Sequence, residues 1–145
     1  MPLATFRHSA TSNAAAPDIW DSLQTADAWG GMSLIDSVSE EVHDEAGRLV
    51  SFRFTTTAGG RTWEGTARNV SSVPGEHMDL TLNTKEIRGR MGIELAPEGG
   101  QTTVAVRLEV EPAGMLATLF WGVVREAITT GFNRQVEEFA ASFGA

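Results

Sequence analysis

The sequence predicts an α+β fold in which a seven-stranded, curved antiparallel sheet wraps one long C-terminal helix. Between Leu3 and Val110, apolar residues mainly alternate with polar ones, which is typical of strands with one covered face. Beyond Pro112, apolar residues recur at steps of three and four as far as Phe143, which indicates one long amphipathic helix. Such a helix needs a sheet against which to bury its apolar stripe.

The N-terminal region predicts one strand followed by one or two short helices. The strand covers residues 3–11, where apolar and polar positions alternate. Pro17 stands where helices often begin, and Asp18 is favourable in a first helical turn. A second helical turn over residues 26–29 ends at the pair Gly30-Gly31.

Six further strands are expected to follow as a meander. Each segment alternates apolar and polar residues, and short runs rich in Gly, Pro or Asp separate several of them. These turn signals are Asp44–Gly47, Ala58–Gly60, Pro74–Gly75 and Pro97–Gly100.

The apolar stripe of the long helix changes face part-way along. At roughly 100° per residue, the first and second groups of apolar residues do not share one side of the helix, and the stripe rotates near Gly131. Two interpretations remain open: the halves pack on different partners, or the helix bends at Gly131 and its first half roofs a cavity. The first group is Leu116, Leu119, Phe120, Val123 and Ala127, and the second is Ile128, Phe132, Val136, Phe139 and Phe143.

Length and composition indicate one domain covering residues 1–145. Hydrophobic residues make up 41% of the chain and charged residues 21%, which is ordinary for a globular protein. No stretch approaches the ~20 apolar residues that a membrane span needs, and the first residues lack the apolar core of an export signal. We therefore expect a cytoplasmic protein, either monomeric or homodimeric.

Charge and cysteine content exclude several classes of site. The net charge is -8 and the basic residues are scattered, so the chain is a poor candidate for binding nucleic acid. The absence of cysteine removes disulfides, thiol nucleophiles and thiolate metal ligands.

Four segments carry a resemblance to a known family: Ala16–Leu23, Trp29–Gly30, Gly89–Gly100 and Leu108–Pro112. In their order and spacing, the chain resembles the START/polyketide-cyclase superfamily (SRPBCC, pollen-allergen-like), which has the helix-grip fold. The resemblance covers about Leu3 to Phe143. It implies a single START-like domain with a cavity between the sheet and the long helix, where family members usually hold an apolar ligand. Some members are polyketide cyclases, and others act on other proteins.

The sequence supplies an apolar lining for such a cavity. Small residues such as Gly65, Ala67 and Gly89 would leave room among the larger ones, although the same side chains could simply fill a core. The residues expected to bind the ligand are Trp29, Phe52, Phe54, Trp63, Met78, Leu80, Met91, Ile93, Leu116, Phe120, Val123 and Ala127.

One polar pair is a candidate for acid/base chemistry. If the first two strands lie side by side, His8 could meet Glu40 inside the mouth of the sheet. The alternative is that a bulge shifts the strand register or that Glu40 lies at a solvated strand end. Trp121 lies off the first apolar group, so we expect it either to pack under the loop after Gly31 or to be partly exposed as part of a portal or partner patch.

Other enzyme signatures are missing from the sequence. The three histidines lack the spacing of a zinc site, so we expect no metal, and no Gly-x-Ser-x-Gly elbow or phosphate-binding loop indicates a nucleophile or a nucleotide cofactor. The chain has no tyrosine, and its expected lining is poor in the polar groups that would steer an enolate.

Three functional hypotheses follow. The first is a protein that binds or carries a small hydrophobic ligand, such as a lipid, a polyketide-like compound or an aromatic metabolite, without a cofactor. The second is an enzyme of the cyclase/dehydratase type, and the third is a non-catalytic protein-interaction module.

Overall fold

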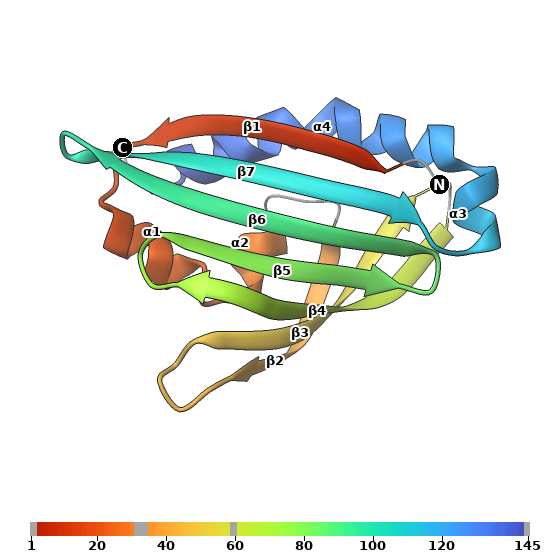
Figure 1. Cartoon of the computed structure of the whole chain (residues 1–145), viewed down its shortest axis with the longest axis horizontal. Helices are drawn as coiled ribbons and strands as arrows, with labels where there is room; N and C mark the ends of the chain where they lie inside the picture. Colours follow the sequence, from red (N-terminus) through yellow and green to blue (C-terminus); the bar gives the residue numbers. More distant parts are fainter. Residues whose placement is uncertain (1–2, 31–34, 59–60, 144–145) are drawn as a thin grey trace.

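The computed structural model describes residues 3–30, 35–58 and 61–143. Its seven strands form one antiparallel sheet in the order β1-β7-β6-β5-β4-β3-β2, which confirms the predicted sheet (Figure 1). The strands are β1 (Ala4–Ser12), β2 (Ile35–His43), β3 (Leu49–Ala58), β4 (Arg61–Val73), β5 (His77–Thr84), β6 (Ile87–Glu98) and β7 (Gln101–Pro112). The helices are α1 (Ala16–Ser22), α2 (Ala26–Gly30), α3 (Met115–Leu119) and α4 (Trp121–Ala141).

The sheet buries one face because its strands alternate as predicted. Met78 and Leu80 of β5 and Met91 and Ile93 of β6 are fully buried, and their cross-strand register brings them together. The same core includes the inner sides of α1, α2 and α4. Figure 1 shows α4 running beside β1, with α1 and α2 towards one end of the sheet and α3 at the other.

The two edge strands are β1 and β2, so the first two strands in sequence lie at opposite sides of the sheet. β1 pairs with β7 without a shift from Ala4 to Ser12, whereas β2 pairs with β3 through three register shifts. Glu40 of β2 has a positive φ of 50°, which is uncommon for a residue other than glycine. The second edge is therefore irregular, as at a β-bulge.

The C-terminal helical region contains a break that the sequence analysis did not predict. α3 ends at Leu119, and Phe120 has φ -106° and ψ 24°, outside the helical range. α4 then runs through Gly131 without interruption, so the predicted change at Gly131 is wrong. Among the described residues, none of the helices combines the length and apolar character needed to cross a bilayer.

The break moves the apolar stripe to different residues. Trp121 and Val124 face the core at the start of α4, while Phe120 is 44% and Val123 52% exposed. Because the chain leaves the helical path at Phe120, the spacing of residues before it does not continue into α4. The second predicted group is correct, since Ile128, Phe132, Val136 and Phe139 are buried and Phe143 packs against the core.

Candidate functional site

A small cavity of about 60 Å³ lies between the inner face of the sheet and the first turns of α4. It is located at the α3 end of the sheet, where β3, β5 and β7 end and β6 begins. Val124 and Ile128 contribute the helix side of the lining. The sheet side consists of Ile35, Phe54, Thr56, Leu82, Thr84, Ile87, Gly89, Leu108 and Val110.

The cavity lining provides apolar surface and two hydroxyl groups. The Thr84 hydroxyl accepts the backbone N–H groups of Glu86 at 3.1 Å and Ile87 at 2.9 Å, so it is already occupied by the turn before β6. Thr56 is 8% exposed and is the second hydroxyl. The rest of the lining is apolar, and no titratable side chain is among its described residues.

Ten of the twelve expected binding residues divide into three groups. Phe54 lines the cavity, whereas Trp29, Phe52, Met78, Leu80, Met91 and Ile93 are buried in the core without lining it. Trp63, Leu116 and Ala127 are only half-buried. The inward direction of the strand residues was predicted correctly, and their contact with a ligand stays a prediction.

The expectation for the start of the C-terminal helix is wrong. Phe120 and Val123 point outwards, because the break after α3 turns Val124 rather than Val123 towards the sheet. Val124 was recognised as apolar but was not among the expected binding residues, for the same reason. Ile128 was recognised as apolar, and Leu82 shares the parity of Met78 and Leu80, so periodicity alone could have added Leu82 to the lining.

His8 and Glu40 do not meet. His8 lies on β1 opposite Val106 of β7, and its Nε2 atom is 3.8 Å from Glu137 Oε1 on α4. Glu40 lies on β2 at the other edge of the sheet and pairs with Arg53, with 3.3 Å between Glu40 Oε2 and Arg53 Nε. The predicted acid/base pair is therefore wrong, because strands that follow one another in sequence are not neighbours here.

No cluster of three or more His, Asp or Glu residues that could hold a metal ion occurs in the part of the chain that the structure describes. Trp121 is 7% exposed, which excludes a partly exposed portal or partner patch, and its indole N–H has no hydrogen-bond partner among the residues that the structure describes. The loop after Gly31, the other environment predicted for Trp121, lies outside the described residues.

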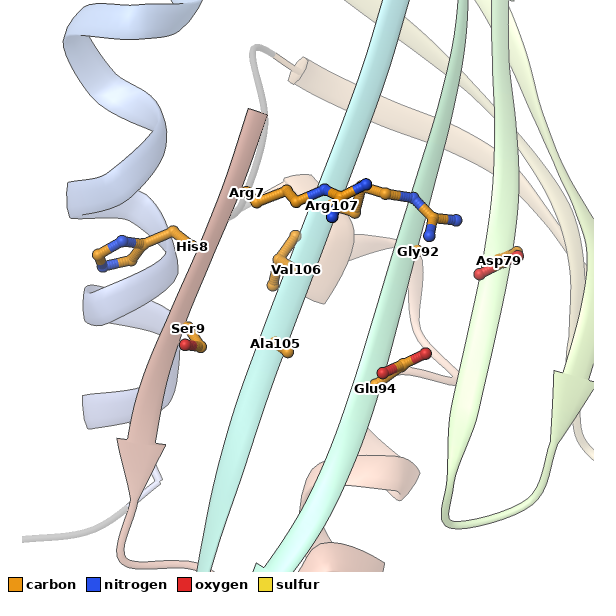
Figure 2. Close-up of a pocket in the computed structure, with 9 residues that line it drawn as sticks. All are labelled: Arg7, His8, Ser9, Asp79, Gly92, Glu94, Ala105, Val106 and Arg107. Atoms are coloured by element: carbon orange, nitrogen blue, oxygen red, sulfur yellow. The ribbon is translucent and has the colours of Figure 1, made fainter. Parts of the chain in front are cut away.

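A larger depression of about 580 Å³ lies on the outer face of the sheet, over β1, β7, β6 and β5 (Figure 2). Arg7, Arg107, Gly92 and Asp79 form one cross-strand row through it. From the sequence, these positions were expected only to lie on the polar face of their strands. Their grouping into a depression was therefore missed.

Comparison with known proteins places the chain in a family. A family model described as polyketide cyclase / dehydrase and lipid transport matches residues 4–144. The chain belongs to this family. The match confirms the resemblance inferred from the sequence, and it spans both the inner cavity and the outer depression. A search of curated proteins finds no match.

Solved structures share the fold of this family member at low sequence identity. The TTHA0849 protein from Thermus thermophilus has a TM-score of 0.73 at 14% identity and covers 98% of this chain and 100% of its own. The Zhui aromatase/cyclase from Streptomyces sp. R1128 has a TM-score of 0.67 at 14% identity, and the match covers 99% of this chain and 100% of that protein. A START superfamily protein from Mycobacterium smegmatis has a TM-score of 0.64 at 15% identity, and the match covers 92% of this chain and 97% of that protein. These likenesses establish the helix-grip fold.

Proposed function

We propose that this protein binds a small hydrophobic molecule, such as a lipid, a polyketide-like compound or an aromatic metabolite, between the sheet and α4. The observation that carries the proposal is the inner cavity, whose lining is apolar apart from two threonines and the backbone of Gly89. Membership of a family described as polyketide cyclase / dehydrase and lipid transport supports it. Burial of apolar ligand surface contributes ~25 cal/mol per Å² before the costs of binding.

Binding requires the cavity to grow. Its volume of about 60 Å³ is small beside the ~300–1,000 Å³ of pockets that hold drug-sized ligands. The first turns of α4 line this end through Val124 and Ile128, and the five-residue α3 precedes them without lining the cavity itself. We infer that an incoming ligand displaces these elements, because the strands opposite them are held in a continuous hydrogen-bonded sheet.

An exposed apolar surface lies at the same end of the molecule. Met115 is 84% exposed and Leu119 71%, and Phe120 and Val123 are also exposed. No charged residue occurs between Pro112 and Arg125. Large exposed apolar side chains in a cluster are unusual for a protein surface and mark places where apolar partners or ligands are met. We therefore infer that the ligand enters next to α3.

Binding is favoured over cyclase-type catalysis by the chemistry of the lining. Aldol dehydration needs a group that removes or donates a proton, and the described lining residues include no such side chain. His8 faces Glu137 at the seam between β1 and α4 and does not line the cavity.

Native mass spectrometry of freshly purified protein tests this function. We expect a retained apolar compound, or uptake of one from a panel of fatty acids and aromatic polyketides. Val124→Phe fills the cavity and should abolish uptake, whereas Val123→Phe places the same side chain on the exposed face and should not. Equal uptake by both variants, or an empty protein that ignores the whole panel, would overturn the proposal.

A further inference from the structure

The outer depression has small residues at its base and long charged side chains around them. Gly92, Ala105 and Ser9 are small residues on β6, β7 and β1, and Ser9 pairs with Ala105 across the strands. A Cβ atom at Gly92 would lie 2.5 Å from Asp79 Oδ1 and 3.5 Å from Arg107 Nη2. The missing side chain at Gly92 therefore allows a carboxylate and a guanidinium to lie over the strand.

Two arginines lie directly opposite each other at one side of this depression. Arg7 of β1 pairs in register with Arg107 of β7, and Figure 2 shows both side chains extending across the sheet towards Asp79. Like charges directly opposite each other on neighbouring strands are destabilising. The sheet thus holds two guanidinium groups together in a chain whose net charge is -8.

The arginines are only partly neutralised by protein groups. Arg107 Nε lies 3.4 Å from Glu109 Oε1, but this buried nitrogen makes no hydrogen bond to any residue in the described ranges. Arg7 forms no ion pair with any residue that the structure describes. Arg107 Nε is enclosed by protein atoms, so the donor capacity left for an acceptor oxygen at this side is that of the exposed Arg7 and of the outer nitrogens of Arg107.

The two acidic residues at the other side differ in whether a basic side chain pairs with them. Asp79 accepts a hydrogen bond from Arg90 Nη2 at 2.9 Å, so its charge is balanced. Glu94, two residues beyond Gly92 on β6, is exposed and takes part in no ion pair within the described residues. Arg7 and Glu94 are thus the unbalanced positive and negative charges of the depression.

We propose that the outer depression binds a short zwitterion, with a carboxylate at Arg7 and Arg107 and an ammonium group at Glu94. The Arg107 guanidinium lies over Gly92, and the two residues from Gly92 to Glu94 along β6 span roughly 7 Å, so the two charges of the ligand are separated by a chain of about four or five atoms. An ω-amino acid such as 5-aminopentanoate has this form. Because the groups are solvent-exposed and screened by salt, the expected dissociation constant is millimolar. This site is separate from the inner cavity and does not depend on the proposed function.

A titration of the ¹⁵N-labelled full-length protein, followed by amide chemical shifts, tests the proposal. The probes are 5-aminopentanoate, pentanoate and pentylamine at constant ionic strength. We expect 5-aminopentanoate to shift the amides of Gly92, Ala105 and Arg107 and to bind at least tenfold more tightly than either singly charged probe. Equal shifts from the three probes would show non-specific ion association, and no shifts would show an empty surface; either result overturns the proposal.

Substitutions locate the site. Arg7→Gln and Glu94→Gln should each weaken 5-aminopentanoate binding at least fivefold. Arg88→Gln is the matched control, because Arg88 is an exposed residue on the same face of β6 but outside the depression. Retention of binding in Arg7→Gln, with a native-like spectrum, would also overturn the proposal.

Discussion

The carboxylate of Glu86 accepts the backbone N–H of Ala117 at 2.9 Å, across 31 residues of sequence. The backbone carbonyl of Glu86 also accepts the N–H groups of Ala113 at 2.7 Å and Gly114 at 3.1 Å. The turn between β5 and β6 therefore holds the first turn of α3, and the Glu86 side chain satisfies a donor that a helix start leaves free. One residue thus fixes the short helix beside the inner cavity.

Removing the Glu86 carboxylate should loosen α3 while the sheet stays intact. Loss of a helix-start acceptor costs about 1 kcal/mol, so in Glu86→Ala we expect amide hydrogen exchange at Ala117 to accelerate about fivefold. Glu76→Ala, in the exposed turn before β5, serves as the control and should leave Ala117 unchanged. Unchanged exchange in Glu86→Ala would show that the backbone contacts alone hold α3.

Truncating the helix wall of the cavity should be costly. Ile128 is 5% exposed and lines the cavity, so Ile128→Ala should lower the free energy of unfolding by about 2–5 kcal/mol through lost burial and an enlarged void. Val123→Ala, on the exposed face of the same helix, should change it by about 0.5 kcal/mol or less. Urea unfolding followed by circular dichroism measures both. Similar losses in the two variants would contradict the observed orientation of α4.

Two buried tryptophans should respond differently to replacement by phenylalanine. Trp29 Nε1 donates to the carbonyl of Leu23 at 2.9 Å, so Trp29→Phe leaves that acceptor unpaired and should cost about 1–3 kcal/mol. Trp121 Nε1 has no partner within the described part of the chain, so Trp121→Phe removes a buried unsatisfied donor and should cost clearly less. Thermal unfolding of the two variants provides the comparison. A larger loss in Trp121→Phe would indicate that the indole N–H has an acceptor in solution.

Two glycines should respond in opposite directions to alanine. A Cβ at Gly122, in the first turn of α4, meets no atom within 4 Å, so Gly122→Ala should stabilise the protein by about 0.4–1 kcal/mol. A Cβ at Gly65 would lie 2.5 Å from the Asn83 backbone oxygen and 2.6 Å from Phe54 Cζ, so Gly65→Ala should destabilise it by more than about 1 kcal/mol. Calorimetry should show the melting temperature rising by about 1–4 °C for Gly122→Ala. A fall in that variant would contradict the helical start at Trp121.

The sheet was predictable because each strand carries its own signal. Met78 and Leu80 alternate with polar neighbours, and a period of two assigns them to the covered face whatever strand lies beside them. Pro17 and Asp18 similarly mark the first helix through preferences that act within one turn. Local patterns were sufficient for these elements.

The helix break and the site depend on contacts between distant residues. Nothing in the local spacing around Phe120 ends a helix, and the contacts that hold α3 apart from α4 come from Glu86, 31 residues before Ala117. The pairing of His8 with Glu40 failed because alternation shows which face a residue takes but not which strand is its neighbour. The outer depression depends on the register that places Arg7 beside Arg107, which no single strand reveals.

The attachment of α4 to the sheet is one-sided. α4 packs mainly on β1 and makes few contacts with β7 and β3. Phe6 of β1 and Phe132 of α4, with ring centroids 6.1 Å apart, lie in the interface between α4 and β1. The resistance of the helix to displacement is therefore anisotropic. Sliding α4 off β1 would disrupt the larger interface, whereas tilting it away from β3 would mainly uncover Val124 and Ile128 around the inner cavity. We expect the cavity to widen in that direction, with the hydrogen-bonded sheet acting as a fixed surface.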